Sequence, residues 1–527
     1  MIWTPSPETS FFGKWTNKHI NRRTGESPSC GFYVNTLEKC LLLCYTLSQM
    51  GTRPCQNNLI QRQITGTDES YMEQTQIRDF TRGNVARQLV VFAWPLFLSN
   101  LLQVVYNMVD MMVVGNVLGK AGISAVSVGG DITHLLTFVA MGFSNAGQVL
   151  IARYIGKRER HKIGRFVGTM GGFLMVCAIL LSVGGLALQP RLLQAMNTPA
   201  AAYEGAAQYS AICMAGLVFI YGYNIVSAIL RGMGDSKHPF IFISLAAILN
   251  LILDLVFVAT PLNMGAGGAA LATVISQGVS FLSCVIFLSR NAPQFELNVR
   301  LRDFIRWDRE MLSALLKLGA PMAIKTASIQ FSKLFVNSWI NSYGVAVSAF
   351  AGIANKISSI ANLISTAMNT VGSTMVGQNI AAGEFGRVKE IMRQMAKITL
   401  TVAAILSLVI CLFPEEIFSV FTDEADADVL SIAAGYVPIA VLLFFGASLR
   451  AIMNGLLNGS GNYRINFVTA ILDGIVMRIG LALLFGLALD MKHYGFWLGD
   501  ALAGFTPFWI GLVFYCTGAW KRGRDAK

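Results

Sequence analysis

The sequence carries little charge for its length. Only 13% of its 527 residues are Asp, Glu, Lys or Arg, and 54% are hydrophobic, whereas soluble proteins carry about 25% charged residues. This composition excludes an ordinary soluble domain. The apolar residues occur in runs long enough to cross a bilayer, which takes about 20 residues. Twelve such runs follow Arg87, at approximately 88–115, 122–151, 165–188, 203–230, 239–259, 265–289, 314–341, 348–375, 393–414, 428–456, 464–489 and 493–517.

Residues that carry enzyme or metal chemistry are also scarce. No HExxH motif is present, no GxxxxGK[ST] phosphate loop occurs, and the nine cysteines form no CxxC pair. ATP-driven transport, a resident cofactor and an enzyme active site are therefore not expected. The five histidines lie scattered along the chain, at His19, His134, His161, His238 and His493.

The net charge is +12, and the distribution of the basic residues indicates how the chain is oriented in the membrane. Lys and Arg gather in the loops after even-numbered runs, as in 153–165 and 290–309, and in the tail 521–527. By the positive-inside rule, these loops and both termini are cytoplasmic in the cell (inner or plasma) membrane. No aromatic-studded basic domain appears, so we expect no nucleic-acid partner.

Residues 1–81 differ from the rest because they are polar and show little periodicity. We expect a disordered cytoplasmic extension. A second hypothesis is that translation begins at Met72, which leads directly into the first apolar run.

The remainder contains an internal repeat with an interval of 224 to 227 residues. Each half then holds six helices, and an even number returns the chain to its starting side, so the halves share one orientation. The sequence predicts an all-α polytopic membrane protein with twelve transmembrane helices: an N-terminal lobe at 82–290, a cytoplasmic linker at 291–313, a C-terminal lobe at 314–518 and a basic tail at 519–527. The matching pairs are Pro95 and Pro321, Ser124-Ala125 and Ser348-Ala349, and Leu230–Asp235 and Leu457–Asn462.

The first and the fifth apolar runs each contain a carboxylate deep inside. Asp110 falls in the first run, and Asp254 shares one helical face of the fifth run with Asn250, four residues earlier. An ionised Asp at mid-membrane costs roughly 2.5–3.5 kcal/mol on insertion scales. Such residues indicate a site for a cation or a proton. The structural alternative is two Asp side chains hydrogen-bonded to neighbouring helices.

Several segments, in order and together with the twelve runs and the repeat, resemble the multidrug and toxic compound extrusion (MATE) transporters over about residues 82–520. The resemblance implies a drug antiporter that exports small amphipathic or cationic compounds as H+ or Na+ enters, working by alternating access as a monomer in the lipid bilayer. The matching segments are Tyr106–Asp110, Val114-Gly115, Leu230–Asp235, Asn250–Asp254, Gly268–Thr273, Gly352–Lys356 and Val376–Asn379.

The resemblance also implies a cation site in the N-terminal lobe, with no metal beyond Na+. Carried over residue by residue, this site comprises Asp110, Asn224, Asn250, Asp254 and Thr273. All five positions hold the side-chain type that the family shows.

Some sodium-coupled members of this family carry acids in the seventh and tenth helices. Here both runs lack them, and the seventh carries Lys325 and Lys333 on one helical face instead. We therefore place coupling in the N-terminal lobe alone. The two lysines either line the central cleft and meet anionic groups, or pair structurally; Arg478 has Asp473 and Asp500 as candidate partners. The alternative function is a lipid-linked oligosaccharide flippase of related architecture, which needs several basic residues in the cleft.

Overall fold

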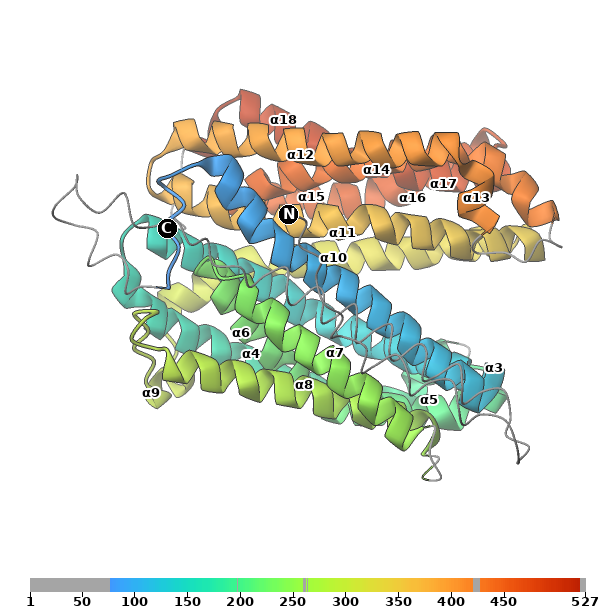
Figure 1. The fold of residues 1–527 in the computed structure, drawn as a ribbon, viewed down its shortest axis with the longest axis horizontal. Coiled ribbons are helices and arrows are strands. Elements are labelled where there is room, and N and C mark those ends of the chain that lie inside the picture. The colour runs from blue at the N-terminus through green and yellow to red at the C-terminus, as the bar shows by residue number, and fades with distance from the viewer. Residues whose placement is uncertain (1–75, 197, 259–261, 263, 420–426, 522–527) are drawn as a thin grey trace, which may run out of the picture. The chain divides into compact units, whose positions relative to one another are not determined.

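The computed structural model describes residues 76–196, 198–258, 262, 264–419 and 427–521. These residues form helices and connecting turns (Figure 1). The predicted extension up to residue 75, the alternative start at Met72 and the last six residues of the predicted tail lie outside the described residues.

The first half of the described chain forms six membrane-crossing segments from apolar, small-residue-rich sequence. Its helices are α3 (Val85–Gly156), η1 (Arg160–Lys162), α4 (Ile163–Ala195), α5 (Ala200–Ala215), α6 (Leu217–Gly232), α7 (Lys237–Phe257) and α8 (Gly265–Arg290), followed by α9 (Leu301–Ile305) in the linker.

The second half repeats this pattern. It contains α10 (Arg309–Asn341), α11 (Val345–Ala381), α12 (Phe385–Leu412), α13 (Pro414–Ser419), α14 (Ala427–Gly459), α15 (Tyr463–Ile471), the π-helical turn η2 (Leu472–Val476), α16 (Met477–Leu483), the π-helical turn η3 (Leu484–Ala488), α17 (Lys492–Ala503), α18 (Thr506–Cys516) and η4 (Ala519–Lys521).

The described helices provide the twelve predicted spans. Nine are long and apolar enough to cross a bilayer, and α5 with α6 forms a tenth span bent by 50°. The 72-residue α3 holds two spans, because Gly119 adopts φ 66° and breaks the helix there. The 33-residue α10 completes the set. The predicted fold class is confirmed.

The backbone shows the internal repeat directly. Gly119 and Gly344 both have positive φ, at 66° and 112°, where the first helix of each half turns into the second. Gly234 and Gly461 have φ of 87° and 68° in the turns that follow α6 and α14. Only glycine adopts such angles readily. The intervals of 225 and 227 residues match those of the sequence repeat.

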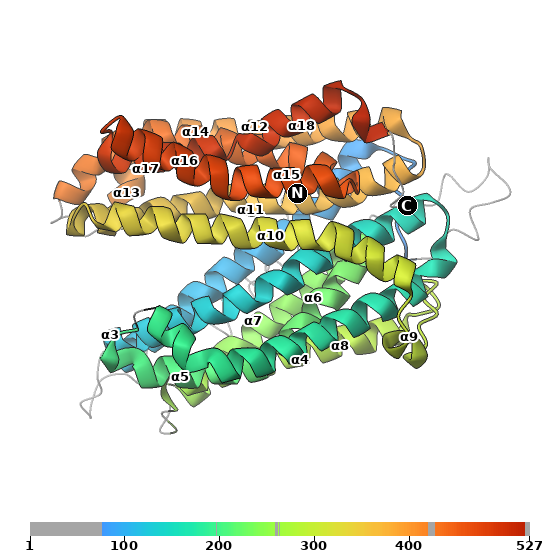
Figure 2. The same cartoon turned by 180° about the vertical axis from the view of Figure 1, so that it is seen from behind.

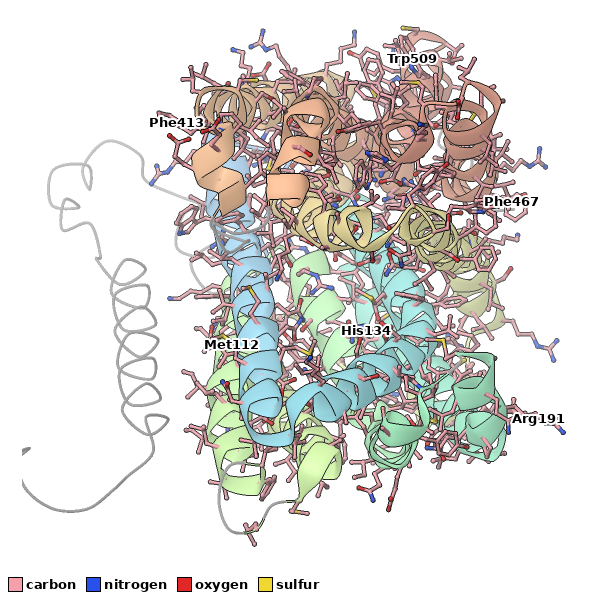
Figure 3. The ribbon with its side chains drawn as sticks, turned by 90° about the vertical axis from the view of Figure 1, so that its right-hand side faces the viewer. Met112, His134, Arg191, Phe413, Phe467 and Trp509 are labelled. Carbon is pink, nitrogen blue, oxygen red and sulfur yellow. The ribbon has the colours of Figure 1, made fainter. Side chains whose placement is uncertain are left out.

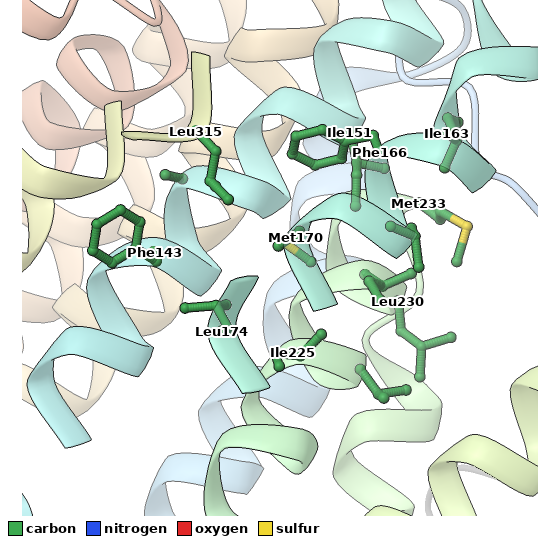
Figure 4. Packing of buried hydrophobic residues seen from close by; sticks show 14 of the residues in the cluster. Phe143, Ile151, Ile163, Phe166, Met170, Leu174, Ile225, Leu230, Met233 and Leu315 are labelled. Carbon is green, nitrogen blue, oxygen red and sulfur yellow. The ribbon is translucent and has the colours of Figure 1, made fainter. Parts of the chain in front are cut away.

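Each half has an apolar core. Figure 4 shows the N-terminal one, in which Phe143, Phe166 and Met170 pack with Leu230 and with Leu315 from α10. A second core lies among α10, α11, α14 and α17. A third core joins the beginning of α3 to α11, α12 and α14. The N-terminal end of the first helix therefore packs against the second half of the chain.

Large apolar side chains cover the outside of both halves. Met112, Phe413, Phe467 and Trp509 are exposed and point outward (Figure 3). A soluble protein rarely exposes such patches. A bilayer supplies their missing neighbours.

The halves meet along a seam, formed by α3 of one half and α10, α11 and the end of α14 of the other. The Gln148 amide donates to Thr374 Oγ1 at 2.6 Å, and Arg153 Nη1 donates to the Ser460 carbonyl at 2.8 Å. The α3 backbone at Gly142 approaches α10 so closely that a Cβ there would lie 2.4 Å from Ala323 Cα. In Figures 1 and 2 the helices of the halves lie side by side near the start of α10 and separate toward α5 and α13.

Candidate functional site

The polar centre of the N-terminal half is built on α7. Its buried residues form one stripe, and Asn250 and Asp254 end that stripe, with exposures of 5% and 0%. Their i, i+4 spacing places both side chains on one face. Small residues on α8 allow close approach: a Cβ at Gly268 would lie 3.0 Å from Phe257 Cβ.

Asp110 of α3 adds a second acid to this centre. Its carboxyl group lies within hydrogen-bonding contact of the Asp254 carboxyl. Two ionised carboxylates only accept hydrogen bonds, so this contact needs a proton on one of them or a cation between them. One oxygen of each, Oδ1, is buried without a hydrogen-bond partner among the described residues.

Asn250 connects the acids to α8. Its amide fits its neighbours with Nδ2 toward Asp254, donating to Oδ2 at 3.3 Å, while its oxygen accepts from the Thr273 backbone N–H at 3.3 Å. The structure thus brings together Asp110, Asn250, Asp254 and Thr273. Asn224, the fifth predicted residue, donates to the Ile220 carbonyl of its own helix at 2.8 Å and, within the described part of the chain, forms no hydrogen bond with the other four.

Two tyrosines that the sequence did not single out flank the acids. Tyr209 of α5 is buried and lies close to the Thr273 side chain and to Asp110. Tyr106, one turn before Asp110, interacts electrostatically with both acids. Tyr209 fits because Gly129 leaves room: a Cβ there would lie 2.7 Å from its ring.

Within the described ranges, no Lys or Arg forms an ion pair with Asp110 or Asp254. The acids of this centre are therefore not neutralised by protein cations. The oxygen-rich surroundings, which are carboxylate, amide and hydroxyl, suit a hard monovalent cation or a proton.

The polar centre of the C-terminal half has the opposite charge. The π-helical turn η2 places Asp473 and Arg478, five residues apart, on one face. Arg478 Nη2 lies 3.4 Å from Asp473 Oδ1, and its Nη1 pairs with Asp500 of α17. The predicted partners of Arg478 are both confirmed.

The two lysines of α10 have different surroundings. Lys325 Nζ donates to Asn454 Oδ1 at 2.6 Å and lies 4.0 Å from Asp473 Oδ2. Lys333 instead lines a cavity of about 300 Å³, together with Arg450, Arg478 and Asp500. Lys325 thus has a structural partner, and Lys333 borders the cavity.

A family model, MatE, matches residues 95–256 and again residues 321–484. The chain belongs to the MATE family. The two matches begin at Pro95 and Pro321, the first pair of the sequence repeat. The resemblance inferred from the sequence is confirmed, and this MATE protein is an integral membrane transporter.

The chain matches curated relatives over nearly the whole length of each relative. "Probable multidrug resistance protein YpnP" of Bacillus subtilis (strain 168) is 28% identical over 443 residues, which is 84% of this chain and 97% of the relative. "Probable multidrug resistance protein YoeA" of the same strain is 27% identical over 445 residues, 84% of this chain and 96% of the relative. A solved structure described as the outward-facing conformation of a multidrug resistance MATE family transporter has a TM-score of 0.76 at 23% identity, covering 86% of this chain and 99% of that one. That likeness shows the fold.

Proposed function

We propose that this MATE protein is a secondary antiporter that exports small amphipathic or cationic compounds in exchange for H+ or Na+. The coupling ion binds in the N-terminal half among Asp110, Asn224, Asn250, Asp254 and Thr273. The facing carboxyls of Asp110 and Asp254, which form no ion pair with a described Lys or Arg, carry the proposal. Two adjacent carboxylates in a low dielectric repel each other, so an added positive charge stabilises the pair.

Both coupling ions suit this centre. A proton shared between Asp110 and Asp254 removes one negative charge and supplies the donor that their contact requires. A sodium ion would use the carboxylate oxygens together with the Asn250 amide oxygen or the Thr273 hydroxyl, which are hard ligands.

Exchange follows from closing and opening the seam. The positive-inside rule places Arg153 and the turn at Ser460 on the cytoplasmic side, so the bonds at Gln148 and Arg153 close that side while the lobes separate at the other. Ion binding neutralises the acids and favours substrate release outward. Each positive charge that then moves inward gains about 2.3 kcal/mol per 100 mV.

The names of the relatives support the substrate class. YpnP and YoeA are each called a probable multidrug resistance protein. We propose the same class of substrate here, with the chain in the cell membrane and both termini in the cytoplasm.

The test is dye transport by the full chain in vesicles. Efflux of ethidium and of rhodamine B is followed under a proton gradient or a sodium gradient, imposed separately. The gradient that drives efflux identifies the ion. Asp110→Asn and Asp254→Asn should each reduce gradient-driven efflux to the level of protein-free vesicles, because the amide cannot bind and release a proton or neutralise Na+.

Asp490→Asn is the matched control. Asp490 is exposed, lies in the turn between η3 and α17 and has φ 50°, which Asn tolerates. It should transport like wild type. Normal gradient-driven efflux by well-expressed Asp110→Asn and Asp254→Asn would refute the coupling site.

A lipid-linked oligosaccharide flippase is the second candidate. The basic side chains that line the C-terminal cavity favour it, since a pyrophosphate needs several cations. Wild-type transport of neither dye under either gradient, together with scrambling of a fluorescent lipid pyrophosphate, would select this function.

A further inference from the structure

The cavity of the C-terminal half lies outside the coupling centre. It is small and partly open, and the space of about 300 Å³ between its lining side chains includes open solvent. Five helices of this half and the turn after α17 supply its walls, so it is part of one folded lobe. The polar lining residues are Lys333 of α10, Ser358 and Asn362 of α11, Arg450 of α14, Arg478 of α16 and Asp500 of α17.

The charges around this cavity do not balance. Arg478 pairs with Asp473 and Asp500, so both acids are already engaged. Arg450 Nη2 donates at 2.5 Å to the neutral Asn362 Oδ1. Within the described part of the chain, Lys333 has neither a hydrogen bond nor an ion pair. Counting Lys325, four cations face two carboxylates, an excess of positive charge in a membrane-embedded lobe.

Excess charge in such a place is expensive unless a partner neutralises it. A second observation points to that partner. Arg478 is 1% exposed, lines the cavity, and its Nε is buried without a hydrogen-bond partner among the described residues. An anionic oxygen in the cavity would compensate the charge of Lys333 and Arg450, and the Ser358 hydroxyl would add a neutral donor.

We propose that this cavity binds the anionic group of the transported compound, a carboxylate in the simplest case. The proposal deepens the proposed export function and rests on it, since it names the substrate class: amphipathic compounds that carry a carboxylate, including zwitterions. A compound with only a positive charge would meet like charge at Lys333 and Arg450. Guanidinium and ammonium groups make strong, charge-assisted hydrogen bonds to carboxylates.

The experiment compares two dyes that differ only in one carboxylate. Rhodamine B has a free carboxylate, and its ethyl ester lacks it, while both share the same cationic ring system. Binding to the purified full chain in detergent is measured by fluorescence polarisation, without any ion gradient. The wild type should bind the acid about tenfold more tightly than the ester, the effect of one charge-assisted contact.

Lys333→Met should reduce this acid-to-ester ratio to about twofold or less. The matched control is Lys397→Met, which removes the same charge from an exposed position on α12 that does not line the cavity; it should keep the wild-type ratio. Sodium benzoate, an anion without a cationic part, should compete with the acid and not with the ester.

Equal affinities of the wild type for acid and ester would overturn the proposal, even if Lys333→Met does not fold. An unchanged ratio in folded Lys333→Met would also overturn it. Because binding is measured without a gradient, these results are independent of the efflux assay. Failure of gradient coupling with a retained acid preference would reject the antiport and leave the anion site in place.

Discussion

The two halves of the transporter share a backbone plan and differ in the charge of their centres. In the N-terminal half, Asp110 and Asp254 face each other, and no Lys or Arg of the described ranges forms an ion pair with either. In the C-terminal half, Arg478 holds two acids while Lys333 and Arg450 remain beside a cavity. The repeat thus preserved turns and helix lengths, and the polar centres diverged.

This difference separates two uses of a buried charge. A charge that has its partner within the protein is part of the folded structure, and removing the partner leaves an uncompensated ion. A charge without a protein partner is stabilised only by something that binds. The comparison therefore predicts that substitutions in the C-terminal network cost stability, whereas substitutions in the N-terminal pair cost transport.

Arg478→Met should have the largest effect on stability. It leaves the buried Asp473 and the adjacent Asp500 without their main cation, and breaking a buried ion pair costs about 3–5 kcal/mol. Thermal melting of the purified protein in detergent measures the change. Adding Asp473→Asn and Asp500→Asn to the same chain should recover much of the loss, because the uncompensated acids are gone.

The control for this change is Arg464→Met. Arg464 is exposed on α15 of the same half, and surface substitutions change stability by no more than about 0.5 kcal/mol. Equal melting temperatures of Arg478→Met and Arg464→Met would mean that the C-terminal network does not stabilise the fold.

Gly142→Ala should have an intermediate effect, because it acts on the seam that both halves share. The new Cβ would lie 2.4 Å from Ala323 Cα and from its backbone nitrogen, which cannot move aside as a flexible side chain can. Overpacking of this kind costs about 1–3 kcal/mol. The same melting assay measures the loss.

Gly184→Ala is the matched control for Gly142→Ala, because it adds the same methyl group at another helical glycine. Apart from the adjoining residues and the nearby backbone of α4 itself, no described atom lies within 4 Å of a Cβ at this position, and Ala is the better helix former by about 1 kcal/mol. This variant should melt at or above the wild-type temperature. If Gly142→Ala has the same melting temperature as Gly184→Ala, the seam at Ala323 is not tightly packed.

Much of the fold followed from the sequence because its signals are local. Apolar runs, basic loops and the paired motifs predicted twelve helices and the repeat, and the spacing of Asn250 and Asp254 put both on one face of α7. Contacts that depend on how helices pack against one another were harder to predict from the sequence. Tyr209 of α5 reaches the polar centre of the N-terminal half because Gly129 of α3 has no side chain, and no local pattern marks that pair.

The C-terminal centre depends on a local departure from α-helical geometry. In a regular α-helix, residues five apart point to different faces, so the sequence gives no spacing signal for Asp473 and Arg478. The π-helical turn brings them together. Asn224 shows the reverse case: the family resemblance places it in the site, while its amide bonds to its own helix at Ile220.

Asp254→Asn should change stability least. The substitution keeps the shape of the side chain and removes one of two facing negative charges, so the melting temperature should stay at the wild-type value or rise, with a free-energy change within about 1 kcal/mol. Asp473→Asn is the matched comparison, since Asp473 is equally buried at 0% exposure but faces Arg478 and Lys325, and losing it should cost about 3 kcal/mol or more. Similar losses for both variants would mean that Asp254 is a structural acid, held by its neighbours like Asp473. A stable Asp254→Asn protein that no longer transports would instead separate the N-terminal acids, which serve exchange, from the C-terminal acids, which serve the fold.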